Sequence, residues 1–175
     1  MRHILICGDV GVGKSTLIEK LLRENRRPLC GFITKRVDTE GSELHEVYIH
    51  PVNGEWLHTQ ENLVGTIDAL GAHPNPQAFD AYGTLMLNTV RGGLVVMDEL
   101  GFLESQAFVF CKKVLCTLDG DIPVLAAIKS KDTPFLRAVK AHPRVNLHQI
   151  TPDNRDELFA SLVTQIKTWN QRIPE

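Results

Sequence analysis

The sequence predicts an α/β fold in which a mostly parallel β-sheet is covered by helices on both faces. Short apolar runs of strand type alternate with segments of helical periodicity at both ends of the chain. This alternation is typical of a three-layer α/β/α sandwich. Between residues 30 and 59, strand-like segments follow one another without a helix. We therefore expect an antiparallel section in the same sheet.

The first elements combine one helix with several strands. HILIC (3–7) is a short apolar run ended by glycine, which predicts a buried strand. Apolar residues at helical spacing predict a helix over 14–23. Loosely alternating, β-branched segments at 30–37 and 44–52 predict a hairpin closed by the turn DTEGSE. A turn dipeptide starts NGEWLHT, so a further strand is expected over 53–59.

The middle of the chain contains the least regular segment. Residues 60–78 include Gly71 and the run HPNP, which predict a surface loop. A helix is expected over 79–90 despite Gly83, and LVVM (94–97) is typical of a buried strand.

Helix and strand alternate through the last third. The pattern predicts helices over 105–118, 133–142 and 153–170, the last with an Asp or Asn start. Apolar runs predict strands at 122–128 and 145–150 between them. These elements should add parallel strands to the sheet.

Composition fits a single domain spanning residues 1–175. The chain is 43% hydrophobic and 23% charged, and its net charge of −2 predicts no nucleic-acid partner and no attraction to an anionic membrane. No apolar run reaches the roughly 18 residues of a membrane helix. The apolar core at the N-terminus is too short for a secretory signal. We expect a cytoplasmic protein, and the sequence indicates no particular protein partner.

A phosphate-binding loop follows the first strand. GDVGVGKS (8–15) matches G-x-x-x-x-G-K-[ST] completely and has a strand before it and a helix after it. Glycines at 11 and 13 let backbone N–H groups surround phosphate oxygens, and the helix N-terminus favours the same anion. The residues expected to bind nucleotide are Gly8, Asp9, Val10, Gly11, Val12, Gly13, Lys14, Ser15 and Thr16.

Three side chains of this loop have separate expected roles. Lys14 is a point charge that reaches the β- and γ-phosphates, and the Ser15 hydroxyl is placed to ligate Mg²⁺. Thr16 is expected to contact the α-phosphate. The sequence therefore predicts a nucleoside triphosphate ligand, with Mg²⁺ as cofactor.

Two adjacent acids end the apolar run at 94–97. Asp98 is expected to hold Mg²⁺ through water, because α/β ligands gather at the C-terminal ends of strands. Glu99 should point differently and orient or deprotonate the water that attacks the γ-phosphate. Glu104 is interpreted as a cap for the following helix, where negative charge is favoured.

Four blocks of the chain resemble the THEP1-type nucleoside-triphosphatases. They are GDVGVGKSTL, GFITKRV (31–37), DELGFLE (98–104) and TPDNRDEL (151–158). The resemblance implies Mg²⁺-dependent hydrolysis of ATP, GTP and other nucleoside triphosphates on a RecA-like sheet, with loose base preference. It supports metal and water roles for Asp98 and Glu99. It also implies that Asn154 and Arg155 lie near the nucleotide.

The chain departs from the family pattern at two basic positions. Phe102 stands where the family has a lysine, and Asp38 stands where it has an arginine. A site that stabilises developing negative charge needs positive charge nearby. The candidate sources are Arg36, Arg91 and Arg155. Lys35 and Arg36 fall where the family has acids, and they should point to opposite faces of the sheet.

Two other functions fit the same motif. A nucleotide kinase would use an acceptor in place of water, although no arginine lies between residues 60 and 90 to form a kinase-type lid. A nucleotide-dependent switch or adaptor would bind nucleotide with slow or no turnover. The absence of the two basic residues keeps this last alternative open beside the expected hydrolysis.

Overall fold

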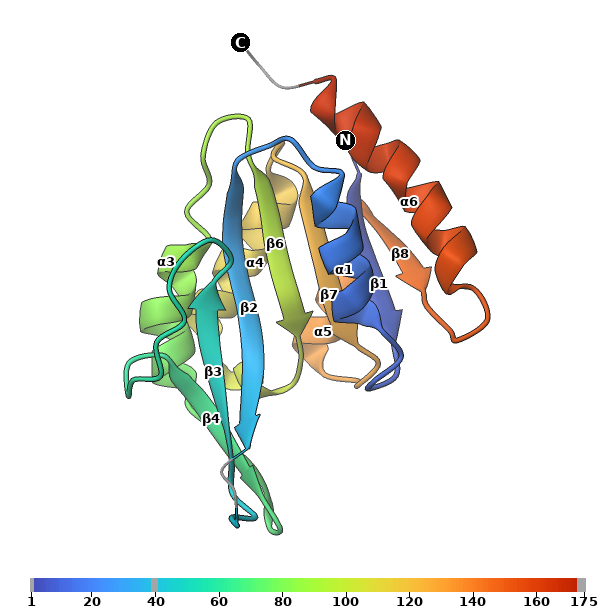
Figure 1. Ribbon diagram of the computed structural model, residues 1–175. Helices are drawn as coiled ribbons and strands as arrows, with labels where there is room; N and C mark the ends of the chain where they lie inside the picture. The colour runs from blue at the N-terminus through green and yellow to red at the C-terminus, as the bar shows by residue number, and fades with distance from the viewer. Residues whose placement is uncertain (1, 39–40, 173–175) are drawn as a thin grey trace.

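In the computed structural model, which describes residues 2–38 and 41–172, eight strands form one mixed sheet (Figure 1). Its strand order is β5-β4-β3-β2-β6-β7-β1-β8. The bounds are β1 His3–Gly8, β2 Leu29–Asp38, β3 His45–Pro51, β4 Leu63–Asp68, β5 Gly71–Pro74, β6 Leu94–Leu100, β7 Val124–Lys129 and β8 Val145–Gln149. The five neighbouring strands β2, β6, β7, β1 and β8 pair in parallel, which confirms the mostly parallel sheet.

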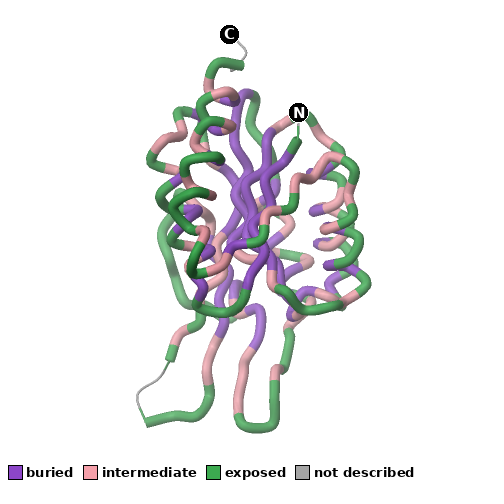
Figure 2. The backbone as a smooth tube through the Cα atoms, turned by 90° about the vertical axis from the view of Figure 1, so that its right-hand side faces the viewer, coloured by how far each residue is buried: buried purple, intermediate pink, exposed green. Residues whose placement is uncertain are grey.

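Helices cover both faces of the sheet and complete three layers. One layer contains α1 (Lys14–Arg23) and α6 (Arg155–Asn170), which pack together. The other contains α2 (Pro76–Ala78), the π-helix η1 (Phe79–Gly83), α3 (Thr84–Met86), α4 (Phe108–Asp119) and α5 (Pro134–Lys140). Figure 2 shows the buried strands between layers with exposed outer surfaces.

Strand β1 explains why both faces need cover. Ile4 and Ile6 pack into the core under α1 and α6, whereas Leu5 and Cys7 pack into the core on the opposite face. Successive side chains of a strand point to opposite faces, so an unbroken apolar run buries both. The short run at the N-terminus thus specifies a central strand.

The expected hairpin is confirmed, because β2 and β3 pair antiparallel. The antiparallel section extends further along the chain than expected, because β4 pairs antiparallel with β3, and β5 with β4. Residues 53–59 are not a strand, and the segment 60–78 contains a hairpin and a short helix instead of a loop. Asp68 closes the hairpin turn by accepting the N–H groups of Leu70 and Gly71 at 2.8 and 3.1 Å.

Two predicted helices have different bounds. The segment from residue 79 begins as a π-helix and ends at Met86 rather than at 90. A β-carbon at Gly83 would lie 3.0 Å from the Phe110 ring, so this glycine permits close packing against α4. Helix α4 begins at Phe108, after a separate 3₁₀ turn, η2 (Leu103–Gln106).

One predicted turn falls partly outside the described residues, and the described helices can be checked for membrane spans. Thr39 and Glu40, in the expected turn DTEGSE, lie outside the described residues. Over 2–38 and 41–172, no helix combines the length and apolar character needed to cross a bilayer.

Candidate functional site

The phosphate loop connects β1 to α1 at the C-terminal edge of the sheet. Gly11 and Gly13 have φ values of 77° and 101°, which lie in the left-handed region that favours glycine. Val12 is buried in the core beneath α1, whereas Val10 is 87% exposed at the loop tip. The first N–H groups of α1 have no carbonyl within the helix to bond. The loop therefore has the conformation that its motif predicts.

Lys14 folds back over the loop that carries it. Its ammonium group donates to the carbonyl oxygens of Gly8 and Asp9, both at 2.9 Å. The side chain is only 6% exposed. Asp9 also accepts a hydrogen bond from the Ser130 hydroxyl at 3.4 Å, which links the loop to the residue after β7. These contacts fix the lysine charge at the centre of the site.

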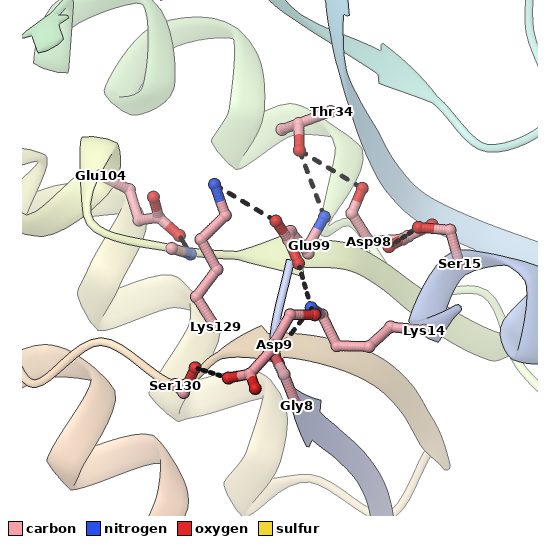
Figure 3. Close-up of polar contacts among 11 residues, drawn as sticks. Gly8, Asp9, Lys14, Ser15, Thr34, Asp98, Glu99, Glu104, Lys129 and Ser130 are labelled. Carbon is pink, nitrogen blue, oxygen red and sulfur yellow. Dashed lines mark hydrogen bonds and ion pairs between the residues drawn. The ribbon is translucent and has the colours of Figure 1, made fainter. Parts of the chain in front are cut away.

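Ser15 and Asp98 meet across the start of α1 and the end of β6. The Ser15 hydroxyl donates to Asp98 Oδ1 at 3.0 Å (Figure 3). Asp98 is 5% exposed, and burial raises the pKa of its carboxyl group to about 6, although the bond from Ser15 opposes the rise. Within the described part of the chain, Asp98 forms no ion pair. A buried carboxylate without a cationic partner, next to a hydroxyl, fits a hard divalent cation such as Mg²⁺.

Glu99 lies between two lysines. Its Oε2 is 3.4 Å from the Lys14 ammonium, and its Oε1 is 3.2 Å from the Lys129 ammonium (Figure 3). The peptide bond between Asp98 and Glu99 is cis. Thr34 of β2 bonds to both residues, because its hydroxyl accepts the N–H of Glu99 at 3.2 Å and donates to the Asp98 carbonyl at 3.5 Å. The two acids thus face different partners, as the sequence predicts.

A cavity of about 430 Å³ joins these groups. Its polar lining includes the phosphate loop with Asp98, Glu99 and Lys129. Its apolar lining comes from β3, β4, η1 and the segment after β6: Val47, Ile67, Phe79, Phe102 and Leu103. The cavity thus brings charged groups of the loop and the β6 and β7 ends together beside an apolar wall.

Glu104 lines the same cavity but does not cap a helix. It lies in the 3₁₀ turn η2, is 3% exposed, and accepts the backbone N–H of Gly101. Burial raises the pKa of its carboxyl group to about 7. The interpretation as a cap of α4 is wrong, because the intervening 3₁₀ turn directs the carboxylate back towards the end of β6.

The residues expected from the C-terminal block lie on the α6 side of the loop. The Arg155 guanidinium lies beside Gly13, with Nε 3.6 Å from where a β-carbon would stand. It lines a second cavity, of about 270 Å³, with Thr16 and Phe159. The Asn154 side chain accepts the N–H of Thr151 and donates to the Gln149 carbonyl, so it fixes the turn before α6.

The other basic candidates lie at different positions. Arg36 lines the first cavity, but its side chain is half exposed and pairs with Asp38 at 2.8 Å. Lys35 instead lies over the Trp56 ring, so the alternation expected for these two neighbours is confirmed. Arg91 precedes β6 at Leu94, whereas the site lies at the other end of this strand.

Sequence reasoning missed Lys129 and the role of Thr34. Lys129 ends the apolar strand β7, just as Asp98 interrupts the apolar run of β6. That shared pattern, a charged residue after a buried parallel strand, could have identified it. Thr34 carries no such signal, because a threonine within an alternating strand is common.

Comparisons with known proteins agree on one family. A family model described as NTPase matches residues 3–163. The cancer-related nucleoside-triphosphatase homolog of Mus musculus is 25% identical, over 95% of this chain and 97% of its own. Nucleoside-triphosphatase THEP1 of Thermotoga maritima is 27% identical, over 94% of this chain and 95% of its own.

Two solved structures share the fold. The crystal structure of THEP1 from Aquifex aeolicus superimposes with a TM-score of 0.71 at 22% identity, covering 94% of this chain and 99% of that one. The solution structure of a human cancer-related nucleoside triphosphatase gives a TM-score of 0.69 at 22% identity, with 96% and 98% covered. These matches bear out the expected α/β/α architecture with its mixed sheet.

Proposed function

The chain belongs to the NTPase family of nucleoside-triphosphate hydrolases, and from this premise we propose that it is an Mg²⁺-dependent enzyme that converts nucleoside triphosphates to diphosphate and phosphate. The observation that carries the proposal is the position of Glu99. Its carboxylate lies 3.4 Å from the ammonium of Lys14, the residue that we expect to contact the γ-phosphate. Asp98 and Ser15 lie beside it as hard oxygen donors.

Each residue of the site has one role in this proposal. The loop from Gly8 to Thr16 binds the phosphates through backbone N–H groups, and Lys14 contacts the β- and γ-phosphates. Ser15 and Asp98 would hold Mg²⁺, which supplies charge neutralisation at the β- and γ-phosphate oxygens. Arg155 lies on the far side of Gly13 and would contact the nucleotide outside the γ-phosphate region.

Glu99 acts on the attacking water. A water oxygen bonds to the γ-phosphorus while the bond from that phosphorus to the β-phosphate oxygen breaks. The carboxylate of Glu99 orients the water and accepts its proton, and the diphosphate departs. Lys14 stabilises the negative charge on the transferred group, because a fixed ammonium in a largely buried site needs no reorganisation during the step.

Broad base preference follows from where the contacts lie. The groups that we assign here bind phosphate and metal, which are common to all nucleoside triphosphates. We therefore expect ATP, GTP, CTP and UTP to be hydrolysed at comparable rates. Strong selection of one base would contradict this part of the proposal.

The test compares the wild type with Glu99→Gln. Phosphate release would be measured with each nucleoside triphosphate, with Mg²⁺ or with EDTA, and binding would be measured by calorimetry. We expect Glu99→Gln to bind nucleotide but to lose about 10²- to 10⁴-fold in kcat, the range for one general base. The exposed Glu157→Gln variant is the matched control and should keep wild-type rates.

Three results would contradict the proposal. Turnover of Glu99→Gln at the wild-type rate would remove the assigned base. Conversion of an added nucleoside monophosphate to diphosphate would indicate a kinase. Tight binding by the wild type without phosphate release would indicate a nucleotide-dependent switch.

A further inference from the structure

We propose that Lys129 is a second catalytic lysine, which contacts the γ-phosphoryl group and stabilises its negative charge during transfer to water. This inference rests on the proposed hydrolysis and deepens it. Its starting point is an ammonium group 3.2 Å from Glu99, on the side opposite Lys14 (Figure 3). One carboxylate thus positions two ammonium groups at the same end of the cavity.

The sheet places Lys129 at the reaction centre. Strand β7 lies between β1 and β6, and Lys129 is its last residue. In the pairing of β1 with β7, Lys129 is directly opposite Gly8, the first residue of the phosphate loop. The side chain therefore leaves the sheet between the loop and the acids of β6, where the γ-phosphate is expected.

Two neighbours direct the side chain of Lys129 into the cavity. A β-carbon at Gly101 would lie 3.2 Å from Lys129 Cδ, so the absent side chain leaves room for the lysine stem. The ammonium lies 5.3 Å from the centre of the Phe102 ring, within range of a cation–π contact. Phe102 supports the ammonium from one side and Glu99 from the other.

The ammonium of Lys129 supplies the positive charge that Phe102 does not carry. In the motif that DELGFLE resembles, a lysine stands where this chain has Phe102. Here the aromatic ring contacts a lysine that arrives from a different strand. A positive charge therefore lies beside Glu99, and Lys129 of β7 supplies it instead of residue 102.

The other basic candidates are less well placed. Arg36 is half exposed and pairs with Asp38, and Arg155 lies on the far side of the phosphate loop. Lys129 has a side chain that is 26% exposed and opens into the cavity. A partly desolvated, positioned charge stabilises a developing phosphate charge more strongly than a solvated one.

The experiment removes the charge and then restores it from residue 102. Lys129→Met keeps the stem of the side chain but loses the ammonium, and Lys131→Met, at an exposed position two residues on, is the matched control. The double variant Lys129→Met with Phe102→Lys returns a lysine to the same wall. Circular dichroism would verify folding, and Lys129→Gln would replace Lys129→Met if that variant were unfolded.

Two quantities would be measured for each variant with Mg²⁺ and ATP. The first is kcat and KM for phosphate release. The second is the gain in diphosphate affinity on adding aluminium fluoride, which mimics the transferred phosphoryl group. For Lys129→Met we expect kcat to fall about 10²- to 10³-fold, as on removal of one charge-stabilising donor, with diphosphate affinity nearly unchanged. The gain from aluminium fluoride should fall in parallel.

Rescue and contradiction are separate outcomes. The double variant should recover at least about tenfold of the lost kcat, equivalent to roughly 1.4 kcal/mol of transition-state binding. Wild-type kcat in Lys129→Met would overturn the proposal. So would a fall in kcat with an intact aluminium fluoride gain, since Lys129 would then only position Glu99. If the wild type releases no phosphate, the proposed function itself fails, and this inference fails with it.

Discussion

Glu104 is a buried carboxyl group whose ionisation should make the fold less stable as the pH rises. It is 3% exposed in the turn after β6, and the backbone N–H groups of Gly101 and of Glu104 itself, with the charge of Lys129, only partly offset its burial. Burial raises the pKa of its carboxyl group from 4.5 to about 7 in the folded chain. The perturbation that isolates this effect is Glu104→Gln, which keeps an oxygen acceptor for Gly101 but cannot ionise.

The sign follows from proton binding in the two states. Below pH 4.5 the carboxyl group is protonated in both the folded and the unfolded chain. Between pH 4.5 and about 7 the folded chain retains the proton that the unfolded chain has lost, so the free energy of unfolding decreases as the pH rises. Above pH 7 both states are ionised and the difference stays constant. At about 1.4 kcal/mol for each pKa unit, the total effect is roughly 3 kcal/mol.

Urea unfolding from pH 4 to pH 8 measures this contribution. The free energy of unfolding of the wild type, minus that of Glu104→Gln, should decrease by roughly 3 kcal/mol over the interval. The same difference for the exposed Glu157→Gln should remain nearly constant. Parallel curves for the wild type and Glu104→Gln, or a difference that increases with pH, would refute the reasoning.

Three further substitutions test other parts of the structure. Lys14→Ala should weaken nucleoside triphosphate binding roughly 10- to 100-fold in calorimetry, the value of a charged hydrogen-bonding group; unchanged affinity would count against the phosphate role. Ser15→Ala should raise the Mg²⁺ concentration for half-maximal hydrolysis about tenfold, and an unshifted Mg²⁺ titration would separate Ser15 from the metal. Gly31→Ala should cost at least about 3 kcal/mol in urea unfolding, because its β-carbon would lie 1.9 Å from the Val96 carbonyl at a φ of 108°. Gly41→Ala, also at positive φ but in open space, should cost about 1 kcal/mol; equal losses would show that the contact at Gly31 is unimportant.

The phosphate loop and the two acids could be predicted because their chemistry is local in sequence. The spacing of Gly8, Gly13 and Lys14 permits few other conformations. An aspartate that interrupts a buried apolar run is expected at the end of its strand. In a parallel sheet, the C-terminal ends of the strands lie on the same side as the phosphate loop. Glu99 is one residue beyond Asp98, so the sequence predicts that the two side chains point differently.

The parts that were missed depend on tertiary pairing. The hairpin of β4 and β5 is rich in glycine and proline, and it is a strand pair because Val64 enters the core and Asp68 closes the turn. Lys129 is 30 residues from Glu99 along the chain, and their contact exists because β7 inserts between β1 and β6. The charged residue that ends an apolar strand marks Lys129 as a candidate, but no local pattern encodes that insertion, so its contact with Glu99 emerged only from the structure.

Hydrolysis in water labelled with oxygen-18 tests the central claim most directly. If water attacks the γ-phosphorus in the site formed by the phosphate loop and Glu99, mass spectrometry should find one labelled oxygen in each phosphate released in a single turnover. The nucleoside diphosphate should carry no label. Label in the diphosphate would place the attack at another phosphorus, and unlabelled phosphate would show that water is not the nucleophile.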